Sequence, residues 1–323
     1  MWLRLILMHA AGGLSLSQTV ARAKARRWAD VSAVALHKRL RTSGPWLKAL
    51  TSHVVAAQHR GLAATPAIKG KVLRVVDATD ILEPGATGTD WRLHYSLRLP
   101  DLVCDHFELT DKHGGERLGR FVFRPDEVVL ADRGYCHRGG VAQVLDAGAD
   151  VVVRLVPAGF PLQDADSGTF NVLAKCAALG VGQHREWQVW FEHDGWLRAL
   201  RLCVMRKTES ATQEARRKLV QKARDKGTKL QDQTLENAAY VMILTSLDAR
   251  QWSARNVLEL YRSRWQIELA FKRLKSLLHA GHVPKSSDPS SRAWLQAKIL
   301  TALLIESLLC ERRSFSPYSG RMG

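Results

Sequence analysis

The spacing of apolar residues predicts a central β-sheet. Short runs rich in valine, leucine and isoleucine have the pattern of strands covered on both faces. These runs are residues 71–76, 128–131, 150–156 and 240–244. Between the first two, residues 91–99 alternate apolar and polar side chains, as a strand with one covered face does. Residues 102–110 are the expected antiparallel partner, with a turn at Pro100 and Asp101.

Helical patterns precede the sheet and also interrupt it. Residues 3–62 contain short amphipathic stretches; Ser15 or Ser17 is placed to cap one of them, and Asp30 or Ser32 to cap another. A further helix is expected at residues 138–147, where Gly148 suits the C-terminal cap. Strands mixed with helices in this order indicate an α/β fold with a mixed sheet, preceded by a small helical segment.

The pattern changes between residues 157 and 235. Residues 186–191 and 197–206 predict a hairpin around His193, Asp194 and Gly195, and residues 211–229 form a basic, helix-forming tail. We expect a β-rich insertion here. The predicted divisions are a basic helical segment (1–68), the first part of the core (69–156), the insertion (157–235), the second part of the core (236–312) and a disordered tail (313–323).

A long helix over residues 252–279 is expected to lie on this core. On a regular helix, Tyr261, Arg264, Glu268 and Lys275 fall within an arc of roughly 60°. An apolar arc lies beside them, formed by Leu260, Ile267, Phe271, Leu274 and Leu278. The alternative to a functional role is an ordinary salt-bridged amphipathic helix, in which Glu268 pairs with Arg264 or Lys272.

The charge of the chain indicates a polyanionic partner. The 323 residues carry a formal net charge of +17, and nucleic acid is the first candidate. Through Gly70 the chain has eleven lysines and arginines against one acid, Asp30. A helical module that touches DNA phosphates and a merely solvated basic face both fit this excess.

Cysteine usage and hydropathy suggest the compartment. The five cysteines contain no C-x-x-C pair, which favours a reducing cytosol over a disulfide framework or a zinc site. The apolar run at the N-terminus is too short for a full signal peptide, and no stretch is long enough to span a membrane. We expect a cytoplasmic protein associated with the nucleoid.

Two aspartates follow apolar runs and are candidates for metal chemistry. Asp77 and Asp132 each come directly after a predicted strand, and strand ends of an open sheet form a crevice. With Glu268 they supply oxygen ligands suited to Mg²⁺ or Mn²⁺, and two such ions promote phosphodiester cleavage. Asp80 and Asp126 are neighbouring acids that spacing does not exclude, and an aspartate in this position is often only a cap.

The stripe formed on this helix by Tyr261, Arg264, Glu268 and Lys275 resembles a known motif. Tyr261-x2-Arg264-x3-Glu268-x6-Lys275 is similar to the Tyr-Arg-Glu-Lys motif of DDE transposases of the insertion-sequence-four family. The segments around Asp77 and Asp132 resemble those around the family's first and second aspartates, and the likeness extends over nearly the whole chain. It implies an RNase H-like core with a β-rich insertion between Asp132 and Glu268.

The resemblance also implies roles and partners. Asp77, Asp132 and Glu268 would be catalytic residues that bind two Mg²⁺ or Mn²⁺ ions, and Tyr261, Arg264 and Lys275 would bind DNA. The partners implied are terminal inverted repeats and target DNA, with a homodimer in the DNA complex that performs cut-and-paste transposition. Relatives stack a tryptophan of the insertion on a flipped base, for which Trp187, Trp190 and Trp196 are candidates.

Both ends of the chain depart from the family pattern. Family members usually have a further N-terminal region, and the C-terminal tail lacks family character, so a truncated copy is expected as one alternative. Such a copy would act as an inactive DNA-binding protein. A nuclease on the same RNase H-like core is another alternative.

Overall fold

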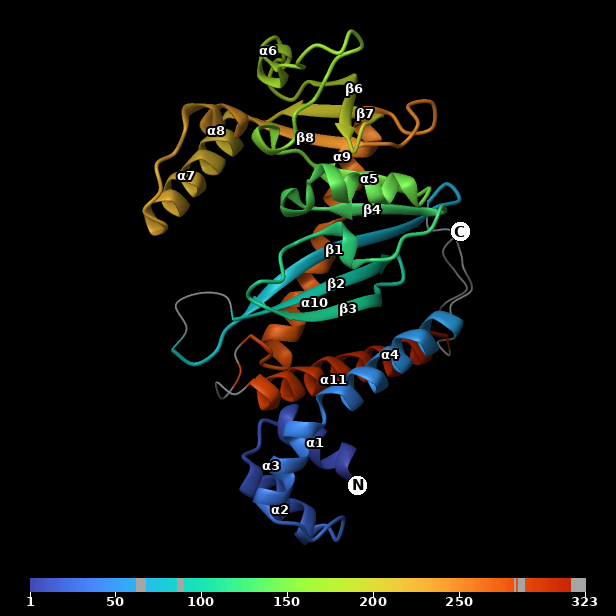
Figure 1. Ribbon diagram of the computed structural model, residues 1–323, viewed down its shortest axis with the longest axis vertical. Helices are drawn as coiled ribbons and strands as arrows, with labels where there is room; N and C mark the ends of the chain where they lie inside the picture. Colours follow the sequence, from blue (N-terminus) through green and yellow to red (C-terminus); the bar gives the residue numbers. More distant parts are fainter. Residues whose placement is uncertain (62–67, 86–89, 282, 284–287, 315–323) are drawn as a thin grey trace. The chain divides into compact units, whose positions relative to one another are not determined.

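The computed structural model describes residues 1–61, 68–85, 90–281, 283 and 288–314 (Figure 1). The chain divides into two compact units. The first unit comprises Met1–Thr65, Asp77–Gly115 and Gln266–Gly323, and the second comprises Pro66–Val76 and Glu116–Trp265. The tail expected to be disordered lies outside the described residues from residue 315 onward. Within the described part of the chain, no helix combines the length and apolar character needed to cross a membrane.

The first unit joins helices to one hairpin of the sheet. Its elements are α1 (Trp2–Ala10), α2 (Leu16–Ala25), α3 (Ala33–Thr42), α4 (Gly44–Gly61), β2 (Trp91–Leu99), β3 (Val103–Asp111), α10 (Trp265–Leu277) and α11 (Asp288–Ser314). Of the candidate caps in the sequence, Ser15 caps α2 and Ser32 caps α3. Ser15 and Gln18 form a reciprocal capping box at α2, and the Ser32 side chain accepts the Ala35 N–H at α3.

The hairpin predicted in this unit is confirmed. β2 and β3 pair antiparallel from Trp91 opposite Asp111 to Arg98 opposite Val103, with one irregularity between Ser96 and Leu97. Helix α11 packs along α4 and also contacts α1, α3 and β3. The inner residues of α11 are buried, so this long helix forms part of the hydrophobic core of the unit.

The second unit contains the parallel strands. Its elements are β1 from Val72 to Val76, η1 (Leu118–Arg120), β4 (Glu127–Ala131), η2 (Arg133–Tyr135), α5 (Arg138–Asp146), β5 (Asp150–Arg154), η3 (Pro157–Gly159), α6 (Val172–Cys176), β6 (His184–His193), β7 (Trp196–Arg206), α7 (Glu209–Asp225), α8 (Asp232–Asn237), β8 (Tyr240–Thr245) and α9 (Ala254–Arg262). β4 pairs in parallel with both β1 and β5, whereas β8 joins β5 and β7 antiparallel.

The strands form one mixed sheet, as the sequence predicted. The hydrogen-bonded order is β3-β2-β1-β4-β5-β8-β7-β6, so β6 is an edge strand (Figure 1). The predicted hairpin turn is confirmed, because Asp194 and Gly195 both have positive φ between β6 and β7. Gly148 also has the positive φ expected of a residue that ends helix α5. The mixed α/β prediction is therefore confirmed.

The first aspartate does not end its strand. β1 (Val72–Ile81) continues four residues beyond Asp77, whereas the sequence predicted that it stops there. Of the residues that follow, Ala78 and Thr79 are half-buried, Asp80 is exposed and Ile81 is buried, a mixture compatible with a strand that has one exposed face. What ends near Asp77 is the pairing with β4, whose last partners are Val76 and Ala131.

The prediction of one long helix over residues 252–279 is also wrong in one respect. It is divided into α9, which ends at Arg262, and α10, which begins at Trp265. The break uses short-range hydrogen bonds: the Ser263 hydroxyl and amide both donate to the Leu260 carbonyl, and the Arg264 amide donates to the Tyr261 carbonyl. Serine competes in this way with regular helical bonds. Angles computed for one continuous helix therefore do not apply across Ser263.

Candidate active site

The backbone register relates the two predicted aspartates. Val76 of β1 pairs with Ala131 of the parallel strand β4, and each residue is followed directly by an aspartate, Asp77 or Asp132. Asp126, the alternative acid, precedes the start of β4 and is therefore about 20 Å from Asp132 along the strand. The register thus favours Asp132 over Asp126 as the acid at this end of β4.

Within the second unit, Asp132 meets a residue of the predicted stripe. The Tyr261 hydroxyl donates a hydrogen bond to Asp132 Oδ1 at 3.2 Å. Burial raises the pKa of the Tyr261 phenol, and the Asp132 carboxylate raises it further, whereas Arg264 and Arg154 oppose that rise. The guanidinium carbon of Arg264 lies 6.0 Å from the centroid of the Tyr261 ring. Tyr261 is therefore a neutral donor with cations beside it.

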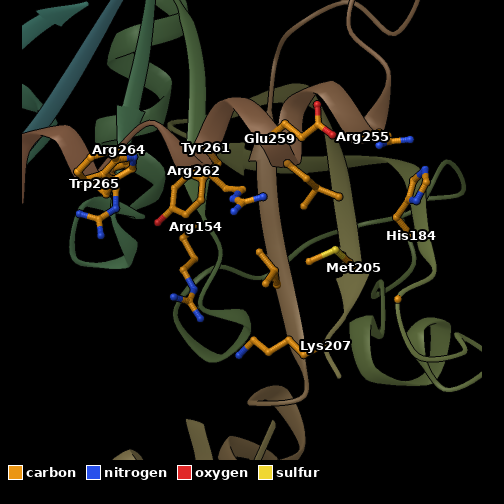
Figure 2. Close-up of a pocket in the computed structure, with 13 residues that line it drawn as sticks. Arg154, His184, Met205, Lys207, Arg255, Glu259, Tyr261, Arg262, Arg264 and Trp265 are labelled. Carbon is orange, nitrogen blue, oxygen red and sulfur yellow. Dashed lines mark hydrogen bonds and ion pairs between the residues drawn. The ribbon is translucent and has the colours of Figure 1, made fainter. Parts of the chain in front are cut away.

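A basic pocket of about 760 Å³ opens beside Tyr261. Figure 2 shows Arg154, Tyr261, Arg262 and Arg264 at one end of this pocket, with Met205, Lys207 and His184 along the rest of it. Its remaining lining residues are Gly182, Val241, Arg255, Leu258, Glu259 and Trp265. One of these cations is already paired, since Arg255 forms an ion pair with Glu259 at 3.0 Å. The pocket thus has an apolar wall and an excess of positive charge.

The sequence did not identify most of these cations. Arg154 is the last residue of the buried strand β5, just as Asp132 follows the buried strand β4. A charged residue at the end of a buried strand was therefore a sequence signal that could have identified Arg154. Lys207 is held at the end of β7 by a bond from its Nζ to the Ala238 carbonyl at 2.7 Å. Burial and the charge of Arg154 lower the pKa of Lys207. No local spacing would have brought it beside Arg154, because the two residues are on different strands.

Within the first unit, Asp77 and Glu268 line one open pocket of about 590 Å³. Lys275, another residue of the predicted stripe, lines the same pocket, together with Ala78, Phe271, Lys272 and Ser276. Asp77 Oδ1 accepts the Ala78 amide at 2.8 Å. The alternative acid Asp80 forms an ion pair with Arg92 at 2.9 Å. Two carboxylates from distant parts of the sequence thus share a site with lysines.

Helix α10, which contains Glu268, is fixed along its length in this unit. The Phe271 ring packs edge-on against Tyr95 of β2, with centroids 6.0 Å apart. At the C-terminal end, Lys298 of α11 donates from Nζ to the Leu278 carbonyl. Beyond the helix, the Gly281 carbonyl accepts the Leu82 amide at 3.1 Å. These contacts hold α10 and the residues after it against β2, α11 and Leu82, which follows β1.

The chemistry of the acids suits hard divalent cations. Carboxylate oxygens are the ligands that Mg²⁺ and Mn²⁺ prefer. Asp77 and Glu268 share a pocket in the first unit, and Asp132 is bonded to Tyr261 in the second. Within either unit, the described residues include no group of three or more His, Cys, Asp or Glu side chains placed to hold a metal ion. The carboxylate oxygens fit Mg²⁺ or Mn²⁺, and each unit by itself supplies only part of the predicted set of Asp77, Asp132 and Glu268.

The candidate tryptophans differ in their surroundings. Trp187 packs against the hydrophobic core and Trp190 is half-buried, whereas Trp196 is 71% exposed at the tip of the β6–β7 hairpin. Within this hairpin, the described residues that line the pocket beside Tyr261 are His184 and Met205, which lie at the end opposite the turn, and none of the three tryptophans lines it. Trp196 is therefore about 30 Å from that pocket along the strand. The tryptophan that does line it is Trp265, which is half-exposed.

Comparison with known proteins assigns a family. The model of the transposase DDE domain matches residues 109–304. InsL of Escherichia coli strain K12, named as a transposase for insertion sequence element IS186A, is 36% identical over 323 residues, which cover 98% of this chain and 86% of that protein. The transposase for insertion sequence element IS421 of Escherichia coli is 36% identical over 324 residues, with the same coverage. Transposases with this domain act on DNA and use divalent metal ions. The chain therefore belongs to the family of DDE-domain transposases, whose RNase H-like fold agrees with its mixed sheet.

Proposed function

We propose that this protein is the transposase of an insertion sequence of the insertion-sequence-four family and cuts and joins DNA at the ends of that element. The observation on which this rests most directly is the pocket that Asp77 and Glu268 share with Lys275. The spacing of Tyr261, Arg264, Glu268 and Lys275 supports the assignment to this family. The identity to the insertion-sequence transposases supports the activity.

Asp77, Asp132 and Glu268 are the proposed ligands of two Mg²⁺ or Mn²⁺ ions. The pairing of Val76 with Ala131 supports a common site for the two aspartates, because each follows directly on one partner of that pair. Bound ions would activate a water or a 3′-hydroxyl and stabilise the leaving oxygen. Without cations, three converging carboxylates would repel one another, so the chemistry of the set itself favours metal binding.

Tyr261, Arg264 and Lys275 are the proposed DNA-binding residues of the site. The Tyr261 hydroxyl orients the Asp132 carboxylate through its hydrogen bond and stays protonated, because burial raises its pKa. The guanidinium of Arg264 can grip a phosphate by two parallel hydrogen bonds, and Lys275 adds a point charge. The cations of the pocket beside Tyr261 extend this positive surface away from Asp132. They suit the DNA backbone next to the scissile phosphate.

The remaining parts of the chain have proposed roles consistent with this activity. Residues 1–68 form a basic helical segment that contacts DNA, and residues 157–235 are an insertion in an RNase H-like core formed by residues 69–156 and 236–312. We place the protein on cytoplasmic, nucleoid-associated DNA. The DNA complex contains a homodimer, because cutting at both ends of one element requires two sites.

The test uses a duplex that contains the terminal inverted repeat of the element and flanking DNA. Purified protein with Mg²⁺ or Mn²⁺ is expected to nick at the end of the repeat. Asp77→Asn, Asp132→Asn and Glu268→Gln should each lower the nicking rate by on the order of 10³ or more. Matched controls are Asp80→Asn and Asp126→Asn, which remove neighbouring acids and should leave the rate within a few-fold. Equal nicking by all five variants would refute the site.

Two other functions are distinguished by the same preparation. A DNA-binding protein without activity would bind the end duplex in a salt-dependent way and leave it uncut with either metal. A nuclease on the same core would cut but would not join a supplied 3′-hydroxyl end to a target plasmid. Transfer of that end into the plasmid is the result expected of the transposase.

A further inference from the structure

Helix α7 (Glu209–Asp225) of the second unit is largely exposed. Of its seventeen residues, all of which the structure describes, Thr212 alone is buried. Figure 1 shows α7 and the short helix α8 beside strands β6 to β8, with α7 extending away from them. A helix with so little packing gains little stability from the core. Core formation therefore does not explain why this segment is present.

The segment is also strongly basic. Residues 209–229 contain seven lysines and arginines against three acids, and residues 1–70 contain eleven against one. These two segments account for most of the net charge of +17. The rest of the chain is close to neutral, so a general requirement for solubility does not explain the local excess.

The cations of α7 lie on its solvent side. Arg216, which is also exposed, donates from Nε to the Leu235 carbonyl at 3.1 Å and so connects α7 to α8. Arg217, Lys218, Lys222 and Arg224 are exposed. Glu214 pairs with both Arg217 and Lys218, at 2.8 and 3.3 Å, and two surface ion pairs of this kind are weak. They can exchange for contacts with phosphates at little cost.

We propose that the outer face of α7, formed by Arg217, Lys218, Lys222 and Arg224, is a second DNA-binding surface that holds the phosphates of a duplex away from the cleavage site. From Arg217 to Arg224 the helix rises about 10 Å, which spans about three phosphates along one strand. The four side chains are all cations, so they bind the backbone without reading bases. The inference rests on the DNA partner of the proposed function, and it does not depend on the assignment of the catalytic residues.

The test compares salt dependence of binding for full-length proteins. The probe is a labelled duplex of arbitrary sequence without any terminal repeat, titrated between about 50 and 300 mM KCl. In Arg217→Gln/Lys218→Gln/Lys222→Gln/Arg224→Gln, the slope of log K against log salt should fall by about 3, and affinity at about 100 mM should fall at least about tenfold. The matched control, Arg217→Lys/Arg224→Lys, conserves charge and should bind like the wild type. Circular dichroism establishes that each variant is folded.

Other outcomes overturn the proposal. An unchanged slope in the fourfold variant would mean that α7 is only a solvated face. Loss of binding to vesicles that contain phosphatidylserine, with DNA binding unchanged, would assign the surface to membranes instead. The Asp132→Asn protein separates the two proposals: it should lose nicking and keep the wild-type slope. If even the wild type fails to nick, the proposed function fails while the comparison of slopes still decides the role of α7.

Discussion

Lys298 makes the stability of the protein depend on pH in a direction that can be calculated. Its side chain is 2% exposed within α11, where it donates to the Leu278 carbonyl and lies 4.1 Å from the centroid of the Trp294 ring. Burial lowers the pKa of Lys298 from 10.5 to about 8, because removal from water disfavours the ammonium form. That change corresponds to about 3 kcal/mol.

The sign follows from the number of bound protons. Below pH 8 the lysine is charged in both the folded and the unfolded chain, and the folded state bears the full unfavourable free energy of burying the charge. Between pH 8 and 10.5 the unfolded chain holds the proton and the folded protein does not, so the free energy of unfolding rises with pH. Lys298→Met has no proton to lose. The wild type should therefore gain about 2 to 3 kcal/mol relative to this variant between pH 7 and pH 10.

Urea unfolding at several pH values measures this difference directly. Other titrating groups are common to both proteins and cancel in the comparison. Lys38→Met, at an exposed lysine of α3, controls for the loss of one charge. A difference between wild type and Lys298→Met that stays constant from pH 7 to pH 10, or that changes in favour of the variant, would refute the reasoning. Faster hydrogen exchange at residues 278–281 in Lys298→Met would show that the carbonyl at the end of α10 has lost its partner.

Three further predictions concern other buried groups. Arg74 and Glu127 form a buried ion pair at 2.8 Å between β1 and β4, so Arg74→Met should lower the free energy of unfolding by about 3 to 5 kcal/mol, measured in urea; a loss below about 1 kcal/mol would contradict this. Burial raises the pKa of Glu306 to about 7, so wild-type stability falls as pH rises from 4.5 through 7, and Glu306→Gln should raise Tm at pH 8 but not at pH 4; equal shifts at both would argue against it. Tyr261→Phe removes the bond to Asp132 and should lower nicking about tenfold or more; a variant that nicks at the wild-type rate would show that the bond is dispensable.

The sequence predicted best those features that depend on a few neighbouring residues, such as helix caps and tight turns. Capping residues narrowed two helix starts to Ser15 or Ser17 and to Asp30 or Ser32, because a cap is formed within four residues, and Ser15 and Ser32 are the caps that form. The hairpin turn at Asp194 and Gly195 was found because positive φ has a strong residue preference. The break at Ser263 was not predicted, since apolar periodicity continues across it and the competing bonds of one serine leave no trace in that pattern.

The candidate site was predictable only where residues follow strands. Asp132 was located because it comes directly after a buried apolar run. Its bond to Tyr261 joins residues 129 positions apart, and only the folded unit reveals it. Lys207 joins the same basic pocket through the pairing of β7 with β8 and the packing of α9 on both, which local spacing does not encode. The resemblance to the family suggested roles for the stripe on α9 and α10, but it did not identify the cations around that stripe.

The position of β6 at the edge of the sheet affects how copies of the protein can associate. An uncovered edge strand offers unpaired amides and carbonyls to any other extended chain. Here the second half of β6 is bridged by Gln163 opposite Trp190, and the first half presents His184, Arg185 and Glu186 to solvent. Charged side chains on an edge strand discourage edge-to-edge pairing of sheets between molecules. This strand is thereby protected against pairing with extended chains of other molecules, which is the way aggregates are templated.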